Sequence, residues 1–192
     1  MARPREFSRE AALAKAMNLF WKQGYEATSV QDLGAQLGLN PGSLYNAFKD
    51  KHSLFLEALD HYSQTQGEQC AQLLGQASGK AALRQFFMLS LETSASDPER
   101  KGCLMVNSAA ELGAHDPEVR ARVRASRAYL RAQFQRSIEQ GQAAGEISRR
   151  RDPALLAEFL VNSLYGLMIS TKMLADHATL MQIVDITLQV LD

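Results

Sequence analysis

Apolar residues recur every three or four positions along most of this chain, and no segment alternates apolar and polar residues over a useful length. The first spacing places side chains on one face of an α-helix, whereas alternation would have indicated strands. The chain is therefore predicted to be all-α. The expected helices run over residues 9–23, 30–37, 41–48, 51–74, 80–94, 104–112, 117–141, 153–175 and 179–191.

Turn chemistry marks a tight break between two short helices near the N-terminus. Thr28 and Ser29 stand where a helix N-cap belongs, with an acidic residue in the turn that follows. Gly38 comes just after the last apolar position, where glycine can take the left-handed conformation that ends a helix. Asn40 then caps the next helix, with Pro41 at its first position. This arrangement predicts a helix-turn-helix.

The second of these helices is predicted to have an apolar inner face and a polar outer face. A short exposed helix with small, hydroxyl and amide groups can enter the major groove and touch base edges. We therefore expect this segment to bind double-stranded DNA. The residues on its outer face are Ser43, Tyr45, Asn46 and Lys49.

The formal net charge is zero, with 21 Lys and Arg against 21 Asp and Glu. Affinity for DNA comes largely from cations that neutralise phosphates, so the distribution of charge must matter more than its total. A basic rim around the helix-turn-helix is predicted, and the alternative is an ordinary mixed-charge surface. The residues of the predicted rim are Arg3, Arg5, Arg9, Lys49, Lys51 and His52.

Several classes of protein are disfavoured. No apolar run approaches the roughly 18 to 20 residues that span a bilayer, and the N-terminus lacks the apolar core of a signal peptide. We expect a cytoplasmic protein without a membrane partner. Cys70 and Cys103 lie far apart without metal-ligand spacing, so both are expected to be free thiols.

An enzyme is not expected. The four histidines fall in separate segments, and the chain has no nucleophile-base motif, glycine-rich phosphate loop or paired metal-binding set. We predict no catalytic residue, no metal and no cofactor. A helical protein-interaction module that binds no operator is the alternative of another class.

The last two predicted helices are apolar on more than one side, as Leu164 and Ile183 illustrate. Such a helix needs a second burial partner. A homodimer through the helices at 153–175 and 179–191 would supply this partner. A helix-turn-helix protein that dimerises can also contact two half-sites of an operator. The predicted domains are a DNA-binding domain over 1–52 and an effector-binding and dimerisation domain over 53–192, with a joint near Gly75.

The N-terminal third resembles the TetR (tetracycline-repressor) family of bacterial transcriptional regulators. One departure is Gly34, where the family usually has alanine, and glycine costs about 1 kcal/mol of helix propensity there. The residues that carry the resemblance are Gly24-Tyr25, Thr28-Ser29, Gly38-Leu39, Gly42-Ser43-Leu44-Tyr45, Phe48, and Lys51 with Leu54.

The resemblance implies a repressor that a small-molecule inducer releases from a palindromic operator. It implies dimerisation through the C-terminal helices and an inducer pocket among the central helices. The implied phosphate contacts are Thr28, Ser29, Tyr45 and Lys51, and the residues nearest the bases are Pro41, Gly42, Ser43 and Asn46. The implied pocket residues are Phe86, Met105, Asn107, Phe134 and Tyr165.

A second candidate for the effector site is Cys103, which opens the helix at 104–112, where free amides favour the thiolate form. Lys172 is the one charged group in the apolar second half of the helix that begins at Pro153. Both resemble groups in electrophile- and oxidant-responsive members of the family, which predicts a repressor switched by covalent modification of Cys103. The alternatives are a packed cysteine, a lysine that reaches water, and a reversibly bound inducer.

Overall fold

The computed structural model of the chain describes residues 8–76, 79–173 and 176–192. Within these ranges the structure contains helices and no strand, which confirms the predicted all-α class. The helices are α1 (Arg9–Gln23), α2 (Val30–Leu37), α3 (Pro41–Phe48), α4 (Lys51–Gln76), α5 (Gly79–Ala95), α6 (Leu104–Leu112), α7 (Pro117–Ala144), α8 (Pro153–Lys172), α9 (His177–Leu188) and a short 3-10 turn, Gln189–Leu191.

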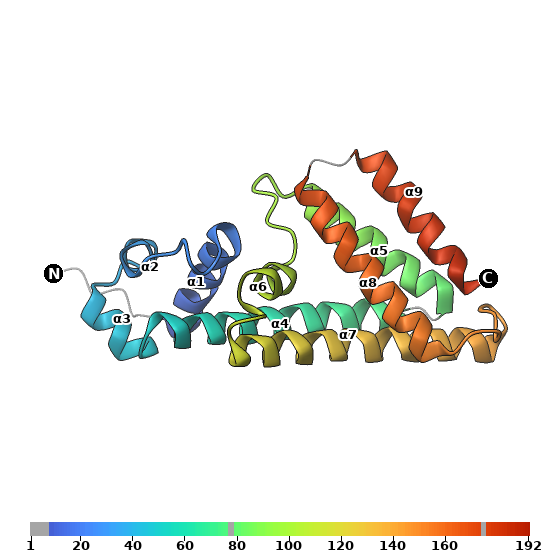
Figure 1. Cartoon of the computed structure of the whole chain (residues 1–192), viewed down its shortest axis with the longest axis horizontal. Coiled ribbons are helices and arrows are strands. Elements are labelled where there is room, and N and C mark those ends of the chain that lie inside the picture. The colour runs from blue at the N-terminus through green and yellow to red at the C-terminus, as the bar shows by residue number, and fades with distance from the viewer. Residues whose placement is uncertain (1–7, 77–78, 174–175) are drawn as a thin grey trace.

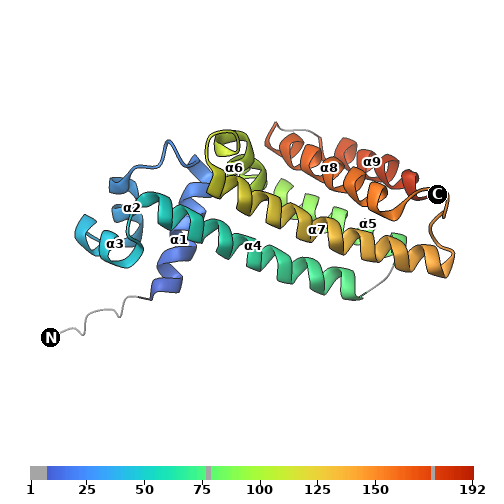
Figure 2. The same cartoon turned by 60° about the horizontal axis from the view of Figure 1, so that its bottom comes forward.

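The two longest helices, α4 and α7, lie side by side along much of the molecule (Figure 1). Helices α1, α2 and α3 form the head at one end, and α5, α8 and α9 pack at the other end. Helix α6 lies between these two groups, and the view in Figure 2 shows it close to the start of α7. The head is therefore joined to the rest of the protein both by α4 and by contacts with α6.

Buried side chains form two clusters. The first joins the head to the start of α4 and also contains Leu104, Met105 and Leu112 of α6. The second joins the end of α4 to α5, α7, α8 and α9. The core thus ties α6 to the head, although α6 follows the predicted boundary between 1–52 and 53–192. That boundary stays a prediction.

Capping groups explain where the helices end. Helix α7 continues three residues beyond the predicted end, to Ala144, because Gly145 (φ 78°) takes the left-handed conformation there. Helix α9 begins at His177, two residues earlier than expected, because the Asp176 side chain accepts the N–H of Thr179 (2.9 Å). The predicted end of the preceding helix, at residue 175, lies outside the described residues.

Gly34 lies where α2 meets the turn into α3. A Cβ atom added there would lie 2.9 Å from the carbonyl oxygen of Leu39, closer than real Cβ atoms come to backbone. The absence of a side chain therefore permits this close turn. The propensity cost of about 1 kcal/mol is the consequence of that geometry.

Candidate functional site

The start of each short helix is fixed by the capping groups that the sequence indicated. The Ser29 hydroxyl accepts the N–H of Asp32 (3.1 Å), and the Asp32 carboxylate accepts the N–H of Ser29 (2.9 Å), which completes a capping box on α2. The hydrogen bond from the Ser29 hydroxyl (2.6 Å) and that from its N–H hold the pKa of Asp32 below its usual value. Asn40 accepts the N–H of Ser43 (2.8 Å), and Pro41 opens α3.

Helix α3 lies at the free end of the head (Figure 1). Leu44 and Phe48 are buried in the first cluster, as its inner face requires. The outer face is available to a partner, and Asn46 is its exposed amide. The predicted DNA-facing residues of this segment are exposed or half-buried: Pro41, Gly42, Ser43, Tyr45, Asn46 and Lys49.

Thr28 does not lie on this surface. The residue is fully buried, and its hydroxyl donates to the carbonyl oxygen of Gly24 (2.6 Å). The predicted phosphate contact of Thr28 is therefore corrected, since a residue without exposed surface cannot reach a phosphate in this conformation. Its hydrogen bonds close the turn between α1 and α2. Ser29 is exposed and stays a predicted phosphate contact.

The basic rim is more engaged in internal contacts than predicted. The Arg9 guanidinium bonds the carboxylate of Glu57 (2.6 Å) and lies 4.9 Å from the centre of the Phe48 ring. These contacts hold α1 against α3 and α4. Arg3 and Arg5 lie outside the described residues.

At the junction of α3 and α4, Lys49 is exposed, whereas Lys51 and His52 are half-buried. The Lys51 ammonium lies 4.2 Å from the centre of the Tyr25 ring, a cation–π contact. His52 Nε2 lies 2.6 Å from a carboxylate oxygen of Asp116, at the start of α7. His52 thus joins the start of α4 to the start of α7, which its place in the sequence did not indicate.

A cavity of about 670 Å³ opens between the head and the central helices. Its size suits a small organic molecule. Its wall includes residues from α1, α4, α5, α6, α7 and α8, so the cavity lies between the head and the central helices. The wall residues that matter most below are Trp21, Tyr62, Phe86, Cys103, Met105 and Tyr165.

Four of the predicted effector residues, Phe86, Cys103, Met105 and Tyr165, do line this cavity. Three other predicted residues, Asn107, Phe134 and Lys172, are not part of the described wall, and their role stays a prediction. Phe134 is fully buried with its ring centre 5.2 Å from that of Phe86, so it supports the wall from outside. Lys172 donates from Nζ to Asn107 Oδ1 (3.0 Å), and the Asn107 amide donates to the Lys101 carbonyl (2.9 Å). Those two residues brace the loop before α6.

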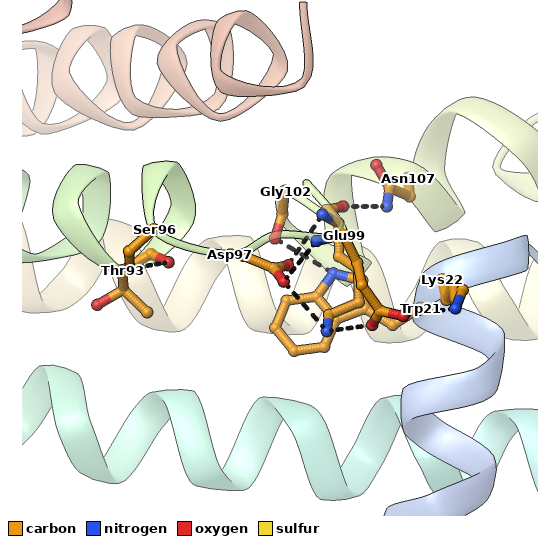
Figure 3. A network of polar contacts seen from close by, with 9 residues as sticks. Trp21, Lys22, Thr93, Ser96, Asp97, Glu99, Gly102 and Asn107 are labelled. Carbon is orange, nitrogen blue, oxygen red and sulfur yellow. Dashed lines mark hydrogen bonds and ion pairs between the residues drawn. The ribbon is translucent and has the colours of Figure 1, made fainter. Parts of the chain in front are cut away.

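The loop between α5 and α6 is held by the polar network in Figure 3. Asp97 accepts the backbone N–H groups of Glu99 (3.1 Å) and Lys101 (3.0 Å). The Lys101 ammonium bonds Glu99 (2.9 Å) and lies 3.5 Å from Asp97. The Trp21 indole N–H donates to the carbonyl of Gly102 (3.2 Å), and Lys22 pairs with Glu99 (2.5 Å). The loop that leads to Cys103 is therefore fastened to α1.

Cys103 lies at the N-cap position of α6, within the cavity wall. The Tyr62 hydroxyl donates to its sulfur (3.6 Å), and the Tyr62 ring packs edge-on against Trp21 at 5.0 Å. Burial raises the pKa of Tyr62, and the charge of a Cys103 thiolate raises it further. The same two causes raise the pKa of Tyr165 to about 12. Both phenols therefore stay protonated near the thiol at neutral pH.

Cys70, the other cysteine, lines the cavity from α4 but is buried. Burial raises the pKa of its thiol to about 12. Cys70 is therefore a protonated, unreactive thiol at neutral pH, and Cys103 is the partly exposed one.

The far end of α6 holds the turn that leads into the helix-turn-helix. The Glu111 carboxylate accepts the N–H of Tyr25 (3.0 Å) and the N–H of Glu26 (2.8 Å). Gly24 (φ 88°) makes room for it, because a Cβ atom there would lie 3.0 Å from a Glu111 oxygen. Helix α6 thus begins at the cavity and ends on the head. No sequence motif pointed to Glu111 or to Trp21.

Helices α8 and α9 expose apolar side chains on one side of the protein. Leu155 (66% exposed), Phe159 (45%) and Met173 (68%) follow one face of α8, and Ile183 and Ile186 (65%) lie on α9. These residues form the outer face. Leu164, by contrast, is buried and lines the cavity, so it is not an outer-face residue as the sequence pattern suggested.

Among the described helices, α8 is long and apolar enough, by length and composition only, to cross a membrane. Its inner side is buried in the second cluster, between α5, α7 and α9. The core helix of a water-soluble protein meets the same criterion, so this finding is weak evidence for a membrane span.

Comparison with known proteins gives consistent results for both parts of the chain. Residues 12–58 match the family described as bacterial regulatory proteins, tetR family, and residues 79–186 match a tetracyclin repressor-like C-terminal domain. The HTH-type transcriptional repressor ComR of Escherichia coli (strain K12) is 36% identical over 97% of this chain and 90% of its own length. The uncharacterized HTH-type regulator YezE of Bacillus subtilis (strain 168) is 34% identical over the full length of both chains.

A solved structure is also similar over its whole length. It is a cysteine-substituted variant of the TetR family transcriptional regulator CifR in complex with a 26-base-pair double-strand operator. The two chains are 31% identical with a TM-score of 0.86, and each is covered completely.

Proposed function

The chain belongs to the TetR family of bacterial regulatory proteins and is a DNA-binding transcriptional regulator, and we propose that it is a homodimeric repressor released from a palindromic operator by a small molecule. One observation carries the proposal that a small molecule releases the DNA: Trp21 belongs to the head and also lines the cavity. Because operator DNA is cytoplasmic in bacteria, the proposal places the protein there. It includes no catalytic step, cofactor or metal.

Helix α3 is the proposed reading element. Its outer face carries Asn46, whose amide can bond adenine through two hydrogen bonds in the major groove. Ser29, Tyr45 and Lys51 are the proposed phosphate contacts, which fix register without choosing sequence. The operator complex of the CifR variant supports this role for a fold of this shape.

Asn46→Ala is expected to relax base preference at one position in each half-site, by about 1–3 kcal/mol. Lys51→Ala should instead weaken binding to all DNA sequences and reduce the slope of log affinity against log salt by about one unit. Fluorescence anisotropy with the operator and single-base variants, at several salt concentrations, measures both. Unchanged affinity and selectivity in both variants would contradict the assignment of α3.

Binding of the purified protein to the DNA upstream of its own gene tests the proposal as a whole. Specific binding should fall steeply with salt, because Lys and Arg displace counterions from phosphates. A protein-interaction module of the same fold would bind this fragment no better than unrelated DNA.

Release requires a ligand that binds more tightly to a form whose reading helices are wrongly placed. The cavity can exert this effect because Trp21 reaches it from α1 and because α6 connects it to the turn held by Glu111. A ligand that displaces the Trp21 indole from Gly102 would weaken the attachment of α1 to the loop. Helix α6, a rigid element, would carry any shift at Cys103 to the head.

A second candidate effector is a soft electrophile that alkylates Cys103. The observation that favours it is the position of this thiol in the cavity wall, next to the Tyr62 hydroxyl. Addition of the thiolate to an activated alkene forms an S–C bond, breaks the C=C π bond and places a proton on carbon. The bulk of the adduct would then occupy the cavity beside α6.

N-ethylmaleimide is expected to modify Cys103 at least tenfold faster than Cys70, because burial keeps the Cys70 thiol protonated. Modification should abolish operator binding. Mass spectrometry and gel shifts measure the two effects on the same sample. Cys70→Ser should lose operator binding on treatment as the parent protein does, and Cys103→Ser should keep it. If Cys103→Ser loses operator binding as readily as the parent, covalent switching at this residue is wrong.

A further inference from the structure

The cavity wall changes in character from its floor to its mouth. The floor consists of buried or half-buried residues that are mostly apolar or aromatic, such as Phe86, Met105 and Leu164. The mouth carries uncharged amides, among them the exposed Gln66 and Gln69 of α4. A molecule that fits this gradient is apolar at its inner end and needs no charge at its outer end.

Only two charged side chains, Asp97 and Lys101, belong to the part of the wall that the structure describes. They lie 3.5 Å apart, and each is already engaged: Lys101 also bonds Glu99, and Asp97 accepts two backbone N–H groups. Neither is free to neutralise a ligand. A carboxylate or ammonium group inside this cavity would lose its hydration without gaining a counterion, which is strongly unfavourable.

Two phenolic hydroxyls in the wall have capacity for a ligand. Tyr62 donates only to the Cys103 sulfur, at 3.6 Å, and sulfur is a weak acceptor. The Tyr165 hydroxyl makes no hydrogen bond to any described residue, although its side chain is half-buried in the wall. Tyr62, Tyr165 and Cys103 all line this cavity, Tyr62 from α4, Tyr165 from α8 and Cys103 from the start of α6. The wall of one cavity therefore carries two phenolic O–H groups that can donate to a ligand.

We propose that the ligand is an uncharged, mainly apolar carbonyl compound whose oxygen accepts hydrogen bonds from Tyr62 and Tyr165. This inference rests on the proposed function only in taking the cavity as the effector site. A carbonyl oxygen is a strong acceptor with two lone pairs, so it can take both O–H groups at once. An isostere without the oxygen would displace water from these donors without replacing its hydrogen bonds, and it would bind more weakly.

The sole tryptophan of the chain, Trp21, lies in the cavity wall and reports occupancy directly. Four probes of one shape separate the possibilities: 2-adamantanone, 2-methyleneadamantane, adamantane carboxylate and protonated adamantylamine. None absorbs where tryptophan emits. The ketone has no conjugated double bond, so its binding measures recognition and not alkylation of Cys103. Titrations use the purified full chain, with calorimetry as the second measurement.

The ketone is expected to bind at least about tenfold more tightly than its methylene isostere and than either ion. The double variant Tyr62→Phe with Tyr165→Phe should remove this preference while leaving the affinity of the methylene isostere unchanged, because both rings remain. Tyr129→Phe is the matched control, since Tyr129 lies in the wall but its hydroxyl already donates to the Gly67 carbonyl (3.3 Å). That variant should keep the preference.

The inference is overturned if either ion binds as tightly as the ketone, if the preference survives in the double variant, or if the ketone does not bind up to its solubility limit. Gel shifts with operator DNA on the same samples keep the proposed function separate. Ketone binding that leaves the protein on DNA would support the ligand class and contradict ligand-induced release.

Discussion

Combined replacement of two outer-face residues, Phe159→Glu and Ile186→Glu, will leave the protein monomeric and lower its operator affinity at least about a hundredfold. Both side chains are exposed in the single chain, at 45% and 65%, so the monomer tolerates the new carboxylates. In a dimer formed through α8 and α9 the same carboxylates would be buried without partners. A monomer holds one half-site only and loses the gain in effective concentration that linkage of two heads provides.

Analytical ultracentrifugation measures the association state, and fluorescence anisotropy with a two-half-site operator measures the affinity. Ala71→Glu adds one such carboxylate to the exposed side of α4 and should change neither. A double variant that sediments as a dimer and binds the operator normally would eliminate the outer face of α8 and α9 as the dimer interface. Retained helical circular dichroism separates dissociation from unfolding.

Removal of the carboxylate of Glu111 should lower the free energy of unfolding by about 1–3 kcal/mol, because its hydrogen bonds to two backbone N–H groups are charge-assisted. The lower part of this range applies if water replaces the carboxylate at Glu26, whose N–H is more exposed than that of Tyr25. The same loss should speed hydrogen exchange at these two amides at least about tenfold, since the turn is freed from α6.

Glu111→Ala is compared with Glu92→Ala at one protein concentration, because the stability of a dimer depends on concentration. Glu92 is exposed on α5, and its carboxylate makes no hydrogen bond to the described residues, so its removal should change the free energy of unfolding by no more than about 0.5 kcal/mol. Chemical denaturation and exchange measured by mass spectrometry provide the two results. Equal free energies of unfolding and equal exchange rates in the two variants would show that Glu111 does not hold the turn.

Local chemistry was sufficient to predict most helix ends. Ser29 and Asn40 cap the helices that follow them, as their positions indicated, because a cap depends on hydrogen bonds within a few residues. The two faces of α3 also followed from spacing alone, with Leu44 and Phe48 buried. These predictions needed no knowledge of distant segments.

The candidate effector site was predicted in part. Phe86, Met105 and Tyr165 were placed correctly in the cavity wall, since they lie on central helices that surround it. Phe134 was not, because the rotation of α7 places its side chain behind Phe86. Trp21 was missed, because nothing near it in the sequence indicates that α1 reaches a cavity lined mainly by later helices.

From local patterns alone, most helix ends of this protein could be predicted, as could the helix-turn-helix and the apolar character of α8 and α9 on more than one side. Packing between distant segments sets which of those sides is internal, so that Leu164 lines the cavity while Phe159 faces outward. It also buried Thr28 and placed Glu111 on the turn before α2. Caps and apolar spacing depend on residues within one or two helical turns. The rotation of a helix about its axis, and the choice of the helices that pack against it, depend on contacts between segments far apart in the chain.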